Sequence, residues 1–282
     1  MPEFLAIHTS DAQLLGCALR TAAARVQLAH GSPAAGVGFF QSDDVLMRKR
    51  PLGANQPAVP EQLAEGVESE AAIICAGELK LPSHGPRAYH EQATFPFRFR
   101  RWLVAFAGDP DGLAPARAAL LTAVPDFLRR AARGDSAAEA LVLLFLSRLR
   151  DLGKLDDPNL QAEPAARALA SALGDAERAL EAQGVARPPL AIAASNGRAL
   201  IGLRRGHPLW TRALDGIQHC ARHEVSPQMS PHHPFARSHR ALQARLLLSG
   251  DATSANHVAE GFAQVPEGGL VAIDRDLAVH IA

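Results

Sequence analysis

Histidine and cysteine side chains gather in one stretch of the sequence, where they could bind a metal ion. His219 and His223 are four residues apart, a spacing that can put two side chains on one face of a helix. Further donors lie nearby in sequence: Cys220, His232, His233 and His239. The prolines at 227, 231 and 234 indicate an irregular loop, and the spacing matches no compact zinc signature. We therefore expect no metal site and interpret these histidines as loop or surface residues.

The three cysteines, Cys17, Cys75 and Cys220, are too few and too scattered for a disulfide framework. No two of them have the close spacing of a zinc knuckle. Cys75 lies in the apolar run 71–76, which is typical of a buried strand. We interpret all three as buried or neutral thiols without a catalytic role.

A proline at position 2 offers a different chemistry. Initiator methionine is usually removed before a small second residue, which would expose the secondary amine of Pro2 as a general base or nucleophile. The simpler interpretation is that Pro2 begins an edge strand, where a missing N–H group is harmless. We favour this second interpretation.

These residues must be positioned by a layered arrangement of strands and helices. The pattern predicts a hairpin over 35–48 with its turn at 42–44, and a second hairpin around Asn196-Gly197, the strongest short turn signal in the chain. Further strands are expected at 4–7, 73–79, 102–106, 245–248, 270–273 and 277–281. Helices are expected at 12–28, 114–133, 136–150 and 164–183. Mixed strands with helices between them favour an α/β or α+β layered domain.

Composition limits the classes of function. The 282 residues are 48% hydrophobic, enough for a globular core, and 29 basic residues balance 29 acidic ones. The stretch 98–102 mixes arginines and aromatics as a nucleic-acid strip would, but without net positive charge a solvated strand end or a partner surface is favoured. The longest apolar run, 141–146, is too short to span a bilayer, and no secretory signal is visible. We expect a cytoplasmic protein that binds neither nucleic acid nor membrane.

Several segments, taken together and in order, resemble the class II glutamine amidotransferases of the N-terminal-nucleophile hydrolase superfamily. The resemblance is to small bacterial members, including the ergothioneine-pathway amidases. It rests on the residue ranges 1–6, 35–39, 45–49, 77–80 with Gly85, 93–97, 106–108, 134–139 and 264–270. It implies an α+β fold, a four-layer αββα sandwich formed as a single domain over 1–282. Pro2 would then open onto a cleft floored by Gly108 and bordered by Lys80, Ser83 and Phe95.

The same resemblance implies which chemistry the site has lost. The family uses an N-terminal cysteine as nucleophile, and Pro2 stands in its place. Ala107 replaces the asparagine of the oxyanion hole, while the glycine, Gly108, remains. Ala137 replaces the aspartate that receives the substrate ammonium, and Lys80 replaces the arginine that clamps the carboxylate. His84 and His90 lie near this pocket in the sequence, and we interpret them as exposed loop residues.

We therefore predict a pseudoenzyme that has kept the fold and lost glutamine hydrolysis. It would serve as a binding, scaffolding or regulatory protein, with a protein partner or as a homo-oligomer, and without a cofactor. A small-molecule ligand in the degenerate pocket is left open. Two alternatives remain: an enzyme of altered chemistry that uses the Pro2 amine or Lys80, and an active hydrolase of glutamine or γ-glutamyl amides.

Overall fold

Strand β1 (Glu3–Thr9) places alternate side chains in two separate hydrophobic cores. Phe4 and Ala6 pack into the larger core, whereas Leu5 and Ile7 pack into the smaller one on the other face of the strand. This is the two-residue period of an extended chain buried on both sides. β1 is therefore an internal strand with packed layers above and below it.

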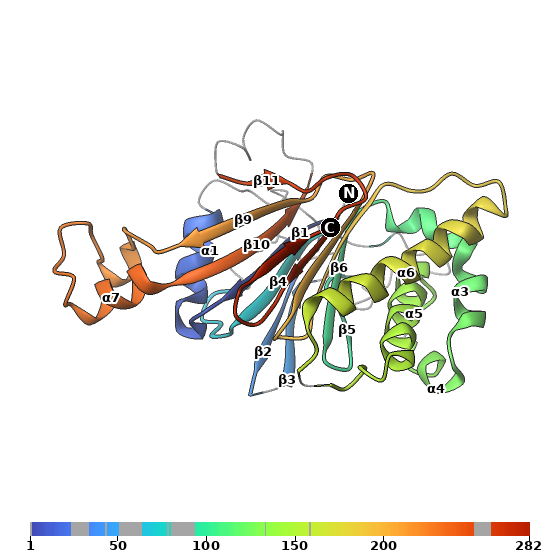
Figure 1. Ribbon diagram of the computed structural model, residues 1–282, viewed down its shortest axis with the longest axis horizontal. Coiled ribbons are helices and arrows are strands. Elements are labelled where there is room, and N and C mark those ends of the chain that lie inside the picture. The colour runs from blue at the N-terminus through green and yellow to red at the C-terminus, as the bar shows by residue number, and fades with distance from the viewer. Residues whose placement is uncertain are drawn as a thin grey trace.

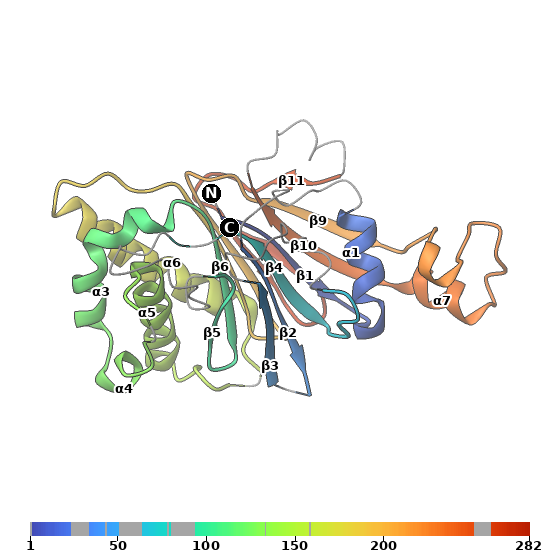
Figure 2. The same cartoon turned by 180° about the vertical axis from the view of Figure 1, so that it is seen from behind.

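The computed structural model describes residues 2–23, 34–42, 44–50, 64–77, 79, 94–132, 134–157, 159–250 and 261–282. These residues form two antiparallel sheets that pack face to face, with helices on the outer faces (Figures 1 and 2). The expected α+β, four-layer αββα sandwich is confirmed.

The first sheet has seven strands and contains β1 near its middle. β1 pairs with β10 on one side and with β4 on the other, so that Phe4 lies opposite both Ser249 and Cys75. The strand order is β11 (Ala263–Gln264), β9 (Trp210–Asp215), β10 (Gln243–Ser249), β1, β4 (Ala71–Ala76), β2 (Ala35–Gln41) and β3 (Asp44–Arg50). The expectation that Pro2 begins an edge strand is wrong, because strands from both halves of the chain enclose β1.

The second sheet has six strands, and three of them, β6, β7 and β8, contact β1 or β4 of the first sheet. The Asn196-Gly197 turn joins β7 to β8 as the sequence predicts, with Gly197 at a positive φ of 87°. The strand order is β13 (Val279–Ile281), β12 (Leu270–Ile273), β8 (Leu200–Arg205), β7 (Leu190–Ser195), β6 (Trp102–Gly108) and β5 (Phe97–Phe99).

Helices α5 (Ala137–Asp151) and α6 (Ala162–Glu181) cover the outer face of the six-stranded sheet, whereas α1 (Leu15–Ala23) covers the seven-stranded sheet (Figure 1). α5 is buried on almost every side because α3 and α6 also pack on it. The remaining helical segments are η1 (Ala12–Leu14), η3 (Pro110–Ala116), α3 (Arg117–Ala123), α4 (Asp126–Arg129), η4 (Ala221–His223) and α7 (Pro234–Ala241). Among the described helices, none is long and apolar enough to cross a bilayer.

Two sequence expectations about local structure have different outcomes. The single helix expected over 114–133 is wrong: the chain breaks at Val124 and Pro125 between α3 and α4, since proline lacks the N–H group that would continue the helix. In the arginine-rich stretch 98–102 the solvated strand end is confirmed for Arg100 and Arg101, which lie exposed between β5 and β6, whereas Phe99 and Trp102 are buried. There Arg98 donates a hydrogen bond to Asp44, and Arg100 pairs with Asp156.

Two of the segments that carry the family resemblance pack directly against each other. Gly36 and Gly38 lie on β2, where an added Cβ on Gly36 would approach the Phe95 carbonyl oxygen to 2.1 Å. An added Cβ on Gly38 would approach the Leu103 side chain to 2.5 Å. The absence of side chains at these positions therefore allows the segment around Phe95 to cross β2 at backbone distance.

Candidate functional site

Three backbone segments lie close together where β1 begins. Pro2 is buried, and its carbonyl oxygen accepts a hydrogen bond of 3.4 Å from the N–H of Gly108 at the end of β6. Gly77 follows β4 with a φ of 97°, and an added Cβ there would lie 2.7 Å from the Pro2 Cα. The predicted neighbours Pro2 and Gly108 are thus in contact, and Gly77 joins them.

Gly108 turns the chain between β6 and the segment that follows. Its φ is 89°, and an added Cβ would lie 2.2 Å from the Pro189 carbonyl oxygen and 3.0 Å from His207 Cγ. His207 is buried and had not been singled out from the sequence, since it stands alone after β8 in no recognisable motif. The chain therefore folds tightly around Gly108.

The other predicted site residues fall into two groups. Ala107 is completely buried in β6, Phe95 is completely buried against the rings of Phe97 and Phe106, and Ala137 is the first residue of α5. Neither alanine carries a polar side-chain atom. Lys80, Ser83, His84 and His90 lie outside the described residues.

The segment 134–139 forms the start of α5 through local hydrogen bonds. Ser136 accepts a hydrogen bond from the Glu139 N–H (3.1 Å), and the Glu139 carboxylate accepts one from the Gly134 N–H (2.8 Å). The first contact caps a free N–H group of the helix end, and the second ties the preceding residue Gly134 to the first turn. The residues of this segment that match the family thus shape the start of the helix.

Two cavities lie at the opposite end of β1 from Pro2. One, of about 250 Å³, is bordered by the ends of β2 and β6 and by the β7–β8 turn, with Ser69 and Arg101 among its lining residues. The other, of about 190 Å³, is bordered by Thr9 and Gln243. Arg275 lines both of them. The resemblance had pointed only to a pocket at the Pro2 end.

His8, near this end of β1, is 1% exposed. Burial, with a smaller contribution from the Arg275 charge, lowers the pKa of His8 to about 4. An unfolded chain binds a proton on this histidine below about pH 6.5, whereas the folded protein binds one only near pH 4. The free energy of unfolding should therefore fall as the pH drops through this window.

We expect His8 to account for a loss of about 2 kcal/mol in the free energy of unfolding between about pH 7.5 and pH 5. Urea unfolding of the wild type and a His8→Gln variant at both pH values measures it, and the variant should lose about 2 kcal/mol less than the wild type. His232→Gln, on an exposed loop, should behave like the wild type. Equal losses for His8→Gln and the wild type would contradict the prediction.

The structure also shows which of the candidate metal ligands lie close together. Cys220, His223 and His239 come together with Cys17, whereas His219 does not share a helix with His223, because η4 covers only Ala221–His223. The interpretation of His239 as a loop or surface residue is wrong, since it is completely buried in α7. Sequence reasoning missed the part of Cys17, which lies 203 residues before Cys220.

The cysteines themselves are buried, as expected. Burial and the neighbouring Cys220 raise the pKa of the Cys17 thiol to about 11, and burial raises the pKa of Cys75 still further. Without a bound metal ion, a thiol with a raised pKa is protonated at neutral pH and is a poor nucleophile. None of this favours a catalytic cysteine.

Solved structures match this fold, whereas no protein-family model and no curated protein matches the sequence. A glutamine aminotransferase class-II domain protein from Silicibacter pomeroyi gives a TM-score of 0.57 at 17% identity, over 99% of this chain and 98% of that one. A predicted glutamine amidotransferase from Pseudomonas aeruginosa gives 0.50 at 15% identity, over 99% and 95%. The allosteric regulatory enzyme of purine biosynthesis gives 0.53 at 13% identity, over 99% of this chain and 48% of that one.

These similarities define the class of fold. The chain has the α+β architecture of class II glutamine amidotransferase domains, with Pro2 at the head of a central strand. At identities this low, the likeness establishes the fold and leaves the activity to be argued from the site.

Proposed function

We propose that this protein is a non-hydrolytic relative of the class II glutamine amidotransferases and serves as a binding, scaffolding or regulatory protein. The observation that carries the proposal is the place of Pro2. It lies at the head of β1 and in contact with Gly108, where the resemblance puts the cysteine nucleophile and the glycine of the oxyanion hole. Proline has no side-chain nucleophile to form a thioester with glutamine.

The surroundings of Pro2 support the same proposal. An oxyanion hole needs N–H donors aimed at the developing charge, but the Gly108 N–H already donates to the Pro2 carbonyl oxygen. The second donor would come from residue 107, and Ala107 has only a buried methyl group. Ala137 likewise offers no carboxylate to a substrate ammonium group.

The residues that match the family have a structural role that does not depend on catalysis. Gly36, Gly77 and Gly108 each stand where an added Cβ would collide with backbone atoms of another segment. A chain that keeps this fold needs those glycines whether or not it hydrolyses glutamine. A protein that has kept the fold and lost the reaction would match the family at positions that pack the fold and differ from it at positions that carry the chemistry.

Assays of ammonia release test the proposal. The purified full chain, with its N-terminus defined by mass spectrometry, is incubated with glutamine and with γ-glutamyl amides. We expect no release above that of a Pro2→Ala variant. We also expect Pro2→Cys alone to stay inactive, because loss of an oxyanion donor costs about 100- to 1,000-fold in rate.

Two outcomes would overturn the proposal in different ways. Turnover by the wild type that disappears in Pro2→Ala would assign the reaction to the N-terminal amine. Turnover that persists in Pro2→Ala would assign it to another nucleophile in the chain. An active glutaminase serves as the positive control for the assay.

A further inference from the structure

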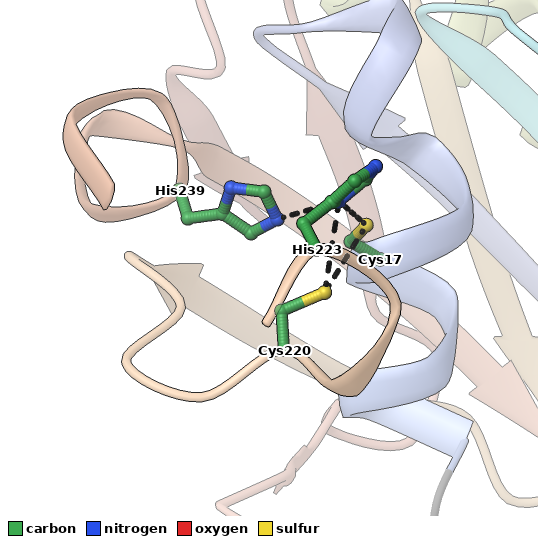
Figure 3. Close-up of side chains that lie close together, drawn as sticks. All are labelled: Cys17, Cys220, His223 and His239. Carbon is green, nitrogen blue, oxygen red and sulfur yellow. Dashed lines mark hydrogen bonds between the residues drawn. The ribbon is translucent and has the colours of Figure 1, made fainter. Parts of the chain in front are cut away.

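Four metal-binding side chains converge from three separate parts of the chain on the outer side of the seven-stranded sheet (Figure 3). Cys17 comes from α1, Cys220 and His223 from the turn around η4, and His239 from α7. One donor atom from each lies within 4.8 Å of all the others. We propose that these four residues bind one Zn²⁺ ion as a structural Cys₂His₂ site.

Four of the six distances between the donor atoms are close to the edges of a tetrahedron around zinc, and the other two are no longer than 4.8 Å. Zinc–sulfur bonds of about 2.3 Å and zinc–nitrogen bonds of about 2.05 Å give edges of about 3.8 Å for S···S, 3.6 Å for S···N and 3.3 Å for N···N. The two sulfurs are 3.6 Å apart, and His223 Nδ1 lies 3.1 Å from His239 Nε2. His223 Nδ1 lies 3.3 Å from Cys17 Sγ and 3.8 Å from Cys220 Sγ.

A hydrogen bond on the far side of His239 prepares that ring for a metal. Its Nδ1 lies 2.7 Å from the Phe235 carbonyl oxygen, which can only accept, so Nδ1 carries the proton. The lone pair of the neutral ring is then on Nε2, the atom that faces the other three donors. This arrangement of a ligating histidine and a backbone carbonyl is common in zinc sites.

The donor set favours zinc over other biological cations. Two thiolates and two imidazoles are softer ligands than magnesium or calcium prefer, and two thiolates balance the charge of a divalent ion. With four protein ligands the coordination shell is complete, which is typical of structural rather than catalytic zinc. Cys17, Cys220 and His239 are all buried, so water has little access to the centre.

The part of the chain that supplies three of the ligands has little core of its own. Residues 216–242, which we call the α7 lobe, leave the sheet after β9, return at β10, and project beyond the sandwich (Figures 1 and 2). In these 27 residues six side chains are buried: Ile217, Cys220, Val225, Ala236, His239 and Leu242. A metal ion that ties the α7 lobe to Cys17 of α1 would supply the stability that so few apolar contacts cannot.

The site belongs to a different part of the molecule from the proposed pseudoactive site. Cys17 and Cys220 are members of the smaller core outside the seven-stranded sheet, whereas Pro2 meets Gly108 of the other sheet. The zinc proposal is therefore independent of whether the protein hydrolyses glutamine.

Metal analysis of the full chain tests the proposal. The protein is purified without chelator, loaded with zinc and dialysed, and its zinc content is measured by plasma mass spectrometry. We expect one zinc per chain. Replacement by Co²⁺ should give the intense visible bands of tetrahedral cobalt and a thiolate-to-cobalt charge-transfer band.

Matched variants locate the ion. Cys220→Ser and His223→Ala should each lower the retained zinc at least about tenfold. Cys75→Ala, a buried cysteine elsewhere, and His232→Ala, an exposed histidine of the α7 lobe, should keep it. Circular dichroism of each variant shows whether the sheets remain folded, and His223, the least buried ligand, is the replacement least disturbing to the core.

Three results would overturn the proposal. The first is a wild type that retains no zinc after loading. The second is equal zinc loss from the ligand and control variants. The third is a Cys17–Cys220 disulfide in the protein as isolated, seen as a mass lower by two hydrogens, because the sulfurs would then be bonded to each other at about 2.05 Å.

Discussion

Replacing Gly36 by alanine is expected to lower the free energy of unfolding by about 4 kcal/mol or more, or to prevent folding. The new Cβ would lie 2.1 Å from the Phe95 carbonyl oxygen and 3.2 Å from the carbonyl carbon. Both are backbone atoms, so no side chain can rotate away, and either β2 or the segment around Phe95 must move. Urea unfolding followed by circular dichroism measures the change.

Gly174→Ala is the matched control for this experiment. Gly174 lies within α6, where its added Cβ would meet only the flexible end of Arg178 at 3.5 Å. Alanine in a helix interior is favoured over glycine by about 1 kcal/mol, so this variant should be as stable as the wild type or more so. A Gly36→Ala protein that unfolds within about 1 kcal/mol of the wild type would refute the close crossing of β2 and the Phe95 segment.

A second large loss of stability, about 3 kcal/mol or more, is expected for Gly108→Ala. Two effects add here. The φ of 89° is a conformation that residues with a side chain rarely adopt, and the new Cβ would lie 2.2 Å from the Pro189 carbonyl oxygen. Thermal and urea unfolding of the variant measure the sum of both.

Gly153→Ala separates the two effects. Gly153 also has a positive φ, of 67°, but an added Cβ there would meet nothing within 4 Å. Its replacement should therefore cost only the backbone strain, about 1 kcal/mol. If Gly108→Ala were no more damaging than Gly153→Ala, the tight packing of Gly108 against Pro189 would be refuted. The presence of glycine at position 108 would then need an explanation other than packing.

The parts of the fold that the sequence predicted are those with local causes. Asn196-Gly197 makes a tight hairpin through its own backbone preferences, and Ser136 caps α5 through a neighbour three residues away. β9 was not predicted, because Thr211 and Arg212 interrupt its apolar pattern and only its place in the sheet makes it a strand. The break at Pro125 was missed because regular alanine and leucine spacing outweighed one proline.

The candidate sites show the same division. The resemblance to a known family predicted that Pro2 and Gly108 lie close together, because it carries three-dimensional information that spacing does not, whereas the contact of Gly77 with Pro2 came from the structure. The grouping of Cys17 with Cys220 had no such guide, because a helix near the start of the chain and a turn near its end share no sequence pattern. His239 was misjudged because its neighbours in sequence are polar and proline-rich, whereas in the structure it packs against His223 and is completely buried.

The place of β1 in the middle of its sheet has a consequence for how the protein is made on the ribosome. β4 can pair with β1 early in synthesis, but β10, the partner on the other side, emerges only after almost the whole chain has been translated. Until then one edge of β1 presents unpaired backbone groups and apolar side chains. Pairing across such a sequence distance is slow, so that edge stays open to wrong pairing with other strands for most of the synthesis.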